Sequence, residues 1–263
     1  MLGKLMKYDL KWIYKPLIIF YILGLVFSGI ARGLSNIENS IIFNIVTQVC
    51  YGISIAMMFN IIINNFMRCW VRLVRNVYKD ESYLTHTLPV KNKTIFLSKV
   101  LSGFIAIITS FVVIFICIAI GYGTKNNIEI IKEILTPIAS MLEVNISTLV
   151  IIIAVILILE FTFILIAGYL GIILGHKSNN KRIIKSVIYG FCAFMVMSIT
   201  TLLLLFMAGL FNSNIMNLFD TVELPNKNTI QLMMYGGIIL YLLYILVYYI
   251  IGSEMIKKGV NVE

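Results

Sequence analysis

The chain has very little charge for its length. Only 13% of its 263 residues are aspartate, glutamate, lysine or arginine, whereas 60% are hydrophobic. A soluble domain of this size needs roughly 25% charged residues to cover its surface. The chain therefore lacks the polar material for a shell that faces water, which excludes an ordinary soluble globular protein.

The sequence also lacks the residue patterns of most catalytic and metal sites. It has two histidines, His86 and His176, and four cysteines without a paired spacing. This spacing predicts neither a disulfide framework nor a metal cluster. The HExxH motif of metalloproteases, the phosphate-binding GxxxxGK[ST] loop and the GxSxG nucleophile elbow do not occur. We predict no catalytic residue and no metal, and we expect that the chain is not an enzyme.

Long apolar runs take the place of these features. Six runs are long enough, at about 18 residues or more, to cross a hydrocarbon core of roughly 30 Å. Continuous apolar runs in lipid predict helices rather than barrel strands. The predicted fold is all-α, a polytopic membrane protein whose six transmembrane helices form one domain over residues 1–263. The predicted spans are 16–34, 41–67, 100–122, 146–175, 186–211 and 230–252.

Lysine and arginine are distributed unevenly between the segments that flank these spans. Most of them lie in the two terminal segments and in the second and fourth connections. The other connections contain only Arg32, Lys125, Lys132 and Lys227 of the 21 basic residues. Such a bias marks the cytoplasmic side of a membrane protein. We predict that both termini are cytoplasmic, and that the net charge of +9 orients the chain rather than binding nucleic acid.

Residues 1–15 have an amphipathic pattern. At 100° per residue, Lys4, Lys7, Lys11 and Lys15 fall on one narrow stripe, and apolar side chains cover the rest. This pattern predicts an N-terminal helix on the cytoplasmic membrane surface, with its lysines toward anionic lipid. Asp9 falls within the apolar side. A salt bridge to a basic residue of the next cytoplasmic loop would explain that position.

Polar residues inside two predicted spans have more than one interpretation. Asn44, Gln48 and Tyr51 share a face of the second span, and Glu160 is the only acidic residue deep in a span. Polar side chains in lipid seek partners or water. The first three residues would either hold helices together or line a translocation path. Glu160 would serve a proton relay, a substrate contact or simple packing. All four are candidates for a translocation path.

Residues 68–99 form the longest predicted cytoplasmic connection, although about 2–8 residues suffice to turn a chain. Residues 78–84 are predicted to form a short helix that stops before Pro89, because the residue before a proline disfavours the helical conformation. The connection is either a solvated basic loop or a projection that another protein grips.

Two stretches resemble a known family. KDESYLTHTLPVKNKTIFLSKVLSG, residues 79–103, closely resembles the Asp-Glu-Gly-Tyr-Leu-Thr-x-Thr-Leu-Pro-Val segment of type-2 permeases of bacterial ATP-binding-cassette (ABC) exporters. Ser82 stands where glycine is usual in that segment. The opening residues MLGKLMKYDLK also look like the start of these permeases. Across the six spans the similarity is one of topology.

The resemblance implies partners, a location and a contact site. Such permeases are six-helix subunits of the bacterial cytoplasmic membrane that pair with a second copy or a paralogue. They couple to cytoplasmic ABC ATPase subunits, which bind ATP and magnesium, so this chain would need no cofactor. A coupling helix between the second and third spans, here within residues 68–99, sits in a cleft of the ATPase. The contact residues carried over are Asp80, Glu81, Tyr83, Leu84, Thr85, Thr87, Leu88 and Pro89.

These expectations favour an exporter permease that moves a hydrophobic or amphipathic substrate outward, such as an antimicrobial peptide, a drug or a lipid-like molecule. Two alternatives stay open. An ion-coupled secondary transporter would use Glu160 and a proton gradient without ATP. A non-transporting membrane protein would confer immunity to a toxin, and it would protect cells even when the partner ATPase is inactive.

Overall fold

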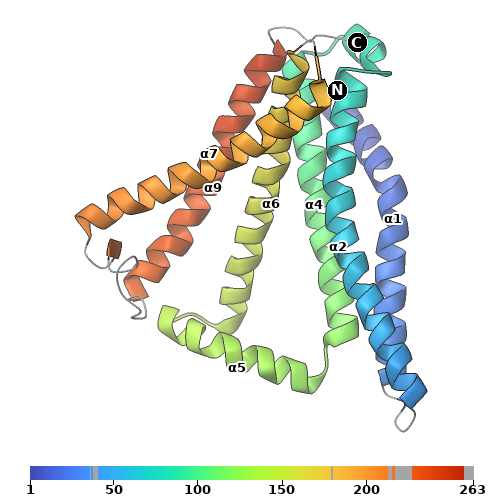
Figure 1. Cartoon of the computed structure of the whole chain (residues 1–263), viewed down its shortest axis with the longest axis vertical. Coiled ribbons are helices and arrows are strands. Elements are labelled where there is room, and N and C mark those ends of the chain that lie inside the picture. The colour runs from blue at the N-terminus through green and yellow to red at the C-terminus, as the bar shows by residue number, and fades with distance from the viewer. Residues whose placement is uncertain (36, 38–40, 179, 213–214, 217–226, 258–263) are drawn as a thin grey trace. The chain divides into compact units, whose positions relative to one another are not determined.

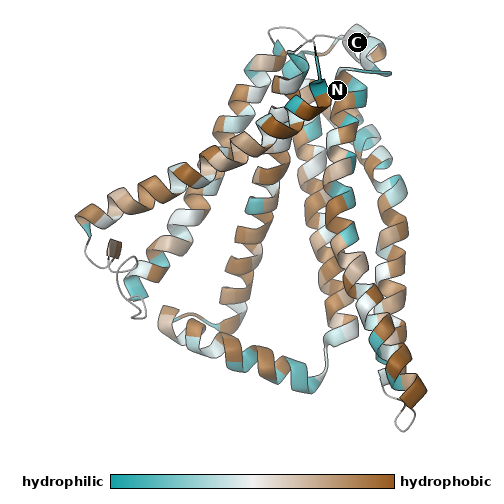
Figure 2. Ribbon diagram, in the orientation of Figure 1, coloured by the Kyte–Doolittle hydropathy of each residue, from teal (hydrophilic) through white to brown (hydrophobic). Residues whose placement is uncertain are grey.

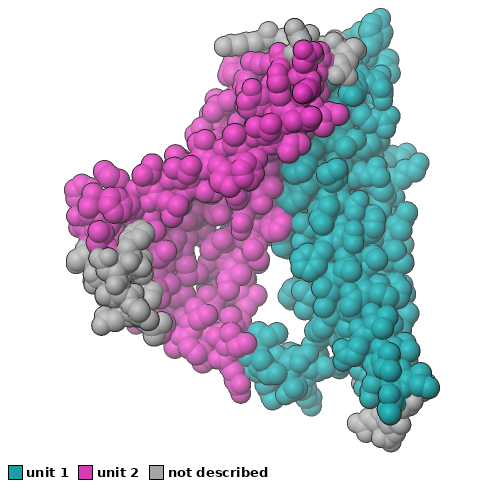
Figure 3. All heavy atoms as spheres, viewed as in Figure 1, with its two compact units in different colours: residues 1–131, 262–263 teal, residues 132–261 magenta. Residues whose placement is uncertain are grey.

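The computed structural model describes residues 1–35, 37, 41–178, 180–212, 215–216 and 227–257. Within these ranges the regular elements are helices (Figure 1). The chain divides into two compact units, which are coloured in Figure 3. Unit 1 contains Met1–Ile131 and unit 2 contains Lys132–Asn261. A single domain over the whole chain stays a prediction.

The six predicted spans each fall within a separate long helix, which confirms the all-α polytopic fold. Figure 2 shows that hydrophobic residues dominate these helices along most of their length. The six are α1 (Leu2–Ser35), α2 (Ile41–Val77), α4 (Asn92–Tyr122), α6 (Ile146–His176), α7 (Arg182–Phe211) and α9 (Lys227–Lys257). Two shorter helices, α3 (Ser82–Thr87) and α5 (Lys125–Leu142), connect α2 to α4 and α4 to α6.

The predicted N-terminal helix is the beginning of α1 rather than an element of its own. α1 continues from Leu2 to Ser35 with Pro16 inside it. Proline lacks the N–H that would bond the carbonyl four residues earlier, here that of Trp12. The helix therefore tolerates one missing backbone bond, and residues 1–15 are joined to the first span without a turn. Their place at the membrane surface stays a prediction.

Unit 1 is held together by α1, which packs along both α2 and α4. Short polar bonds cross these helix contacts. The hydroxyls of Ser28 and Ser54 lie 2.6 Å apart. Asn65 donates through Nδ2 to the carbonyl of Ala106 at 2.8 Å and to Ser110 Oγ at 2.7 Å. Small polar side chains of this kind hold helices together in lipid, where apolar packing gives little preference for protein over acyl chains.

Replacing Asn65 by alanine is expected to destabilise the chain by about 1 kcal/mol, because the variant loses two bonds from α2 to α4. Asn60 is the matched control, since its amide donates at 2.9 Å to Ala56 of its own helix. Asn60→Ala is expected to change stability little. Equilibrium unfolding in mixed detergent micelles would compare the two variants, and equal losses would contradict this account of Asn65.

Unit 2 is organised around α6, which packs along α7 and α9. Small residues bring the backbones of α6 and α7 close together. A Cβ atom on Gly171 would overlap the backbone of Gly190 and the carbonyl oxygen of Ser186, and one on Gly175 would overlap Ser186 as well. These positions admit only glycine at the observed separation of the two helices.

An aromatic cluster lies closer to the beginning of α6, where Phe163 meets both α7 and α9. Phe163 is fully buried, and its ring centroid lies 5.3 Å from that of Tyr248 on α9. The Tyr248 hydroxyl donates to the carbonyl of Ala193 on α7 at 2.8 Å, so this residue links all three long helices of unit 2. A tyrosine buried in this way satisfies its hydroxyl while its ring contributes apolar contact.

Candidate functional site

The connection between α2 and α4 contains the short helix α3. It covers Ser82–Thr87, which is later in the chain than the predicted 78–84. The difference arises because Tyr78 directly follows α2 and stays attached to its last turn: its N–H donates to the carbonyl of Val74 at 2.9 Å, and its side chain is buried. Burial raises the pKa of the Tyr78 phenol far above its ordinary value, so the residue stays neutral.

The end of α3 agrees with the expected effect of Pro89. The helix stops at Thr87, and Leu88 is extended, with φ −66° and ψ 139°. That conformation is the one that a residue before proline prefers. The following residues lead directly into α4 at Asn92. Residues 78–91 therefore separate the end of α2 from the beginning of α4, and α3 is the one regular element among them.

α3 has one buried and one exposed side. Ser82 and Thr85 are buried, three residues apart and therefore on one face of the helix. Tyr83 and Leu84 point away from that face, with 78% and 67% of their surface exposed. A helix of this length has little stability of its own, so contacts to its neighbours must hold it.

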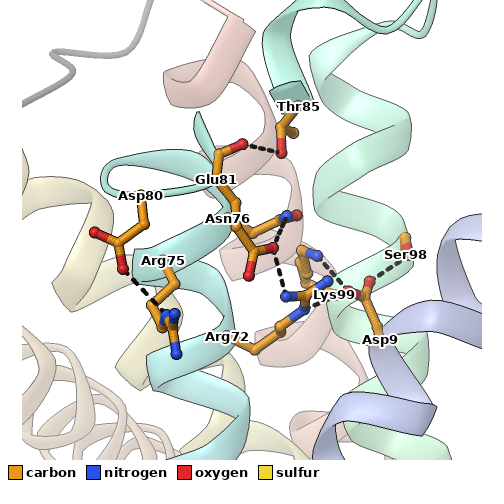
Figure 4. Close-up of polar contacts among 9 residues, drawn as sticks. All are labelled: Asp9, Arg72, Arg75, Asn76, Asp80, Glu81, Thr85, Ser98 and Lys99. Carbon is orange, nitrogen blue, oxygen red and sulfur yellow. Dashed lines mark hydrogen bonds and ion pairs between the residues drawn. The ribbon is translucent and has the colours of Figure 1, made fainter. Parts of the chain in front are cut away.

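Those contacts begin at Asp9, which is buried in α1 with only 2% of its surface exposed. Its Oδ1 accepts from Arg72 Nε of α2 at 2.9 Å and from Lys99 Nζ of α4 at 2.5 Å. Its Oδ2 accepts from the hydroxyl of Ser98 at 2.8 Å. Figure 4 shows how the carboxylate of Asp9 is enclosed by these donors from two other helices. The predicted salt bridge from Asp9 to a basic residue of the following loop is confirmed.

Arg72 continues the chain of contacts to α3. Its Nη1 lies 2.6 Å from Oε2 of Glu81, the residue that directly precedes α3. The same carboxylate oxygen accepts from Asn76 Nδ2 at 3.0 Å. The backbone carbonyl of Glu81 accepts from Thr85, both from its N–H and from its hydroxyl. One arginine side chain thus joins α1, through Asp9, to the first turn of α3, through Glu81 (Figure 4).

We call Asp9, Arg72, Glu81, Ser98 and Lys99 the charged junction. Its two carboxylates and two cationic groups cancel, so the cluster has no net charge. Removing charges from water is costly, and mutual attraction compensates only when the geometry is good and the remaining donors and acceptors are bonded. The short contacts of the junction meet that condition. Losing one of the four charged members would leave the others with an unbalanced charge.

An aromatic ring covers part of the junction. The guanidinium of Arg72 lies 5.5 Å from the centre of the Trp12 ring, and that of Arg68 lies 5.4 Å from it. Guanidinium groups within about 6 Å of an indole ring are attracted to its face. Trp12 is one turn of α1 beyond Asp9, so both residues hold the arginines of α2 against the same helix.

The predicted coupling residues divide into two groups. Those with exposed side chains are Asp80, Tyr83, Leu84, Thr87, Leu88 and Pro89. Glu81 and Thr85 instead face the rest of unit 1 and hold α3 in place. Asp80, next to Glu81, has a side chain that is 68% exposed and pairs with Arg75 at 3.4 Å. A role as a partner contact stays a prediction for all eight residues.

The predicted path residues have different surroundings. Asn44 and Gln48 are exposed on α2. Tyr51 donates to the carbonyl of Gly121 at 3.1 Å, and its ring centroid lies 4.9 Å from that of Tyr122. These contacts favour helix packing for Tyr51. The first three residues belong to unit 1 and Glu160 to unit 2, so a path lined by all four stays a prediction.

Glu160 lies near the middle of α6 and is half-buried. Within the part of the chain that the structure describes, no hydrogen bond or ion pair to its carboxylate is present, although Tyr241 of α9 lies within electrostatic range. An ionised carboxylate in hydrocarbon costs several kcal/mol unless water, a proton or an external partner compensates it. A proton relay, a substrate contact and simple packing therefore all stay predictions for Glu160.

The sequence pattern did not indicate Ser98, Lys99 or Asn76 as site residues. Lys99 was predicted only to be one of the basic residues of the cytoplasmic loop. The one signal was Asp9, an acidic residue on an apolar face, which predicted a basic partner but did not say how many. The additional donors come from the beginning of α4, about 90 residues away in sequence.

The described ranges contain no group of three or more histidine, cysteine, aspartate or glutamate residues arranged to hold a metal ion. Comparison of the chain with protein families, with curated proteins and with solved structures finds no match. The features that bear on function are therefore the six apolar helices, the outward face of α3 and the charged junction that holds α3 in place.

Proposed function

We propose that this chain is the transmembrane permease subunit of an ABC exporter, and that separate cytoplasmic ATPase subunits provide its energy. The substrate would be a hydrophobic or amphipathic molecule, such as an antimicrobial peptide, a drug or a lipid-like compound, moved outward. The six apolar helices and the resemblance of residues 79–103 to type-2 permeases support this proposal. A second permease copy or a paralogue would complete the exporter.

The observation that carries the proposal is the outward face of α3. Tyr83 and Leu84 are highly exposed, yet the helix that presents them is fixed by Glu81 and Thr85. An exposed aromatic residue beside an aliphatic one, on a backbone that is already ordered, is typical of a protein-binding anchor. A loop that only connected two spans would need neither the exposed pair nor the buried ionic support.

The orientation of the chain supports the same conclusion. The ends of α2 and α4 next to α3 contain Arg68, Arg72, Arg75, Lys93 and Lys99. An excess of basic residues favours the cytoplasmic side of the bacterial plasma membrane. On this proposal α3 and both chain termini lie where the ATPase and its nucleotide are.

The charged junction provides a physical route for movement. When ATP binding closes the ATPase subunits, a cleft that holds Tyr83 and Leu84 would displace α3. Arg72 would pass that displacement to α1 through Asp9, since one side chain bonds Glu81 and Asp9 at 2.6 Å and 2.9 Å. Lys99 and Ser98, which also donate to Asp9, would pass the displacement on to α4. The junction residues are positioning residues in this scheme, because they act through α3.

Tyr83→Ala is expected to weaken binding of the ATPase by about 30-fold, which corresponds to about 2 kcal/mol for a central aromatic anchor. Tyr8→Ala is the matched control, because Tyr8 is a similarly exposed tyrosine, 65% accessible, near the start of α1. Affinity would be measured between the purified chain in nanodiscs and the ATPase that co-purifies with it from native membranes. Similar losses in both variants would argue against α3 as the anchor.

The same preparation distinguishes the alternatives. The proposal requires that an ATPase co-purifies with the chain and that transport in liposomes needs ATP after the proton gradient has been collapsed. Transport by the chain alone, driven by a proton gradient and lost in Glu160→Gln, would establish the ion-coupled carrier instead. Protection of cells from a toxin while the ATPase is catalytically inactive would establish the immunity protein.

A further inference from the structure

The helix α5 has three distinct faces. At 100° per residue, Lys125, Glu129, Lys132 and Glu133 fall on one stripe, and all four are exposed. A second face is buried by the protein in the C-terminal half of the helix, where it contains Ala139 and Leu142. The third face is apolar but exposed, and it consists of Ile130, Ile134, Ile138 and Met141. A helix in water would need only the first two faces, so the third requires another explanation.

The buried face fixes the position of the C-terminal half of α5, which belongs to unit 2 from Lys132 onward. Ala139 and Leu142 pack with Leu149, one turn into α6, and the cluster also includes Ile230 and Met234 at the beginning of α9. The carbonyl of Leu142 accepts from the side chain of Gln231 at 3.1 Å. The C-terminal half of α5 therefore lies at the level of the first turns of two spanning helices. Those turns are where a span enters the hydrocarbon.

The exposed apolar face is continuous along the helix. Its members follow one another at intervals of four, four and three residues, and Ile134 at the centre has 62% of its surface exposed. The beginning of α6, against which α5 packs, also presents exposed apolar residues, Val150 and Ile151. The stripe on α5 thus lies at the same level as a surface that a spanning helix offers to lipid.

We propose that α5 lies in the headgroup region of the leaflet opposite α3, with Ile130, Ile134, Ile138 and Met141 inserted into the acyl chains. α3 directly precedes α4 and α5 directly follows it, and the 31 residues of α4 extend about 46 Å. That length exceeds the hydrocarbon thickness of roughly 30 Å, so α3 and the beginning of α5, which both belong to unit 1, lie on opposite sides. The bilayer surface itself is the partner of this face.

Pro137 agrees with a surface position. It lies inside α5 and leaves the carbonyl of Glu133, four residues earlier, without a helical donor. Glu133 belongs to the polar stripe, where water and headgroups can bond that carbonyl. Deep in hydrocarbon an unbonded carbonyl would cost several kcal/mol, so a helix of this kind suits the interface rather than a span.

The charges of α5 indicate which lipids it needs. Two lysines and two glutamates balance on the polar stripe, unlike the basic stripes that select anionic lipid. Insertion then depends on apolar burial alone. We expect α5 to insert equally well in zwitterionic phosphatidylcholine and in mixtures that contain phosphatidylglycerol.

A nitroxide spin label at Ile134→Cys tests the proposal, with Glu133→Cys as the matched control on the polar stripe. Both are made in the Cys192→Ser background, because Cys192 is exposed whereas the other three cysteines are buried. The full chain is placed in phosphatidylcholine nanodiscs, and collisions with oxygen and with a water-soluble nickel chelate are measured. The label at position 134 should meet oxygen and be shielded from nickel, and the label at 133 should meet nickel.

Two results would overturn the proposal. Nickel collisions at position 134 equal to those at 133 would place the stripe in water. Shielding of position 134 from both reagents would mean that protein covers it, for example a second copy of the chain. The measurement needs no ATPase, so failure of this proposal and failure of the proposed export function are separate outcomes.

Discussion

Replacing Asp9 by alanine is expected to lower the free energy of unfolding by about 3–5 kcal/mol. The variant keeps Arg72 and Lys99 buried but removes the carboxylate that both contact, at 2.9 Å and 2.5 Å. Ser98 loses its acceptor at the same time. A buried cation without its counter-charge costs more than the intact pair contributed, because its desolvation is no longer compensated.

The neighbouring ion pair provides the control for Asp9. Asp80 and Arg75 lie 3.4 Å apart with side chains that are 68% and 44% exposed. Asp80→Ala is expected to cost no more than about 1 kcal/mol, because water already solvates both partners. Equilibrium unfolding of both variants in mixed detergent micelles would measure the difference. If the two losses were equal, the buried carboxylate would not have the structural importance that its contacts indicate.

A second Asp9 variant tests whether the charged junction couples the ATPase to transport. Asp9→Asn keeps the shape and some hydrogen bonding of the side chain but removes its charge. If the chain is an exporter permease, this variant should still bind the ATPase through Tyr83, while ATP-driven transport falls. A variant that transported normally would remove Asp9 from the proposed route but would leave the proposed export function intact.

Gly171→Leu is expected to destabilise unit 2 by about 3 kcal/mol or more. Its Cβ would overlap backbone atoms of Gly190 and Ser186, which cannot move aside as the end of a flexible side chain can. α6 and α7 would have to separate, and the packing around Phe163 and Tyr248 would loosen with them. The expected result is a large loss of monodisperse protein in detergent and a lower unfolding midpoint.

Gly236→Leu is the matched control for Gly171. Gly236 lies in α9 of the same unit, and no atom lies within 4 Å of a Cβ placed there. Both substitutions gain the same helix propensity, at most about 1 kcal/mol. We therefore expect Gly236→Leu to be neutral or slightly stabilising. A Gly171 variant as stable as this control would show that the two helices are not held at the separation described.

The helices that span the membrane were predictable because the signal is local. A run of about 18 apolar residues has the same meaning whatever surrounds it, since a bilayer is a fixed thickness of hydrocarbon. Asp9 was informative for a similar reason: a carboxylate on an apolar face must find a cation. In both cases the residues of one short segment were sufficient for the prediction.

Other features depended on residues that are distant in the sequence. Glu81 and Asp80 are adjacent acidic residues in one loop, yet Glu81 bonds Arg72 and Asn76 while Asp80 remains largely in solvent. The two could not be distinguished by pattern, because the difference is set by which way the chain turns after α2. The short helix α3 begins later than predicted for the same reason, since Tyr78 is buried and bonded to the last turn of α2.

The sequence by itself determined that the chain is helical, that it crosses a membrane six times, and that Asp9 needs a basic partner. These conclusions follow from the cost of exposing apolar residues to water and of leaving a charge in an apolar place. Only the tertiary structure decided that Arg72 joins Asp9 to Glu81, that Lys99 and Ser98 complete the cluster, and that Tyr83 and Leu84 face outward. Those facts depend on the relative positions of α1, α2, α3 and α4, which no single segment encodes.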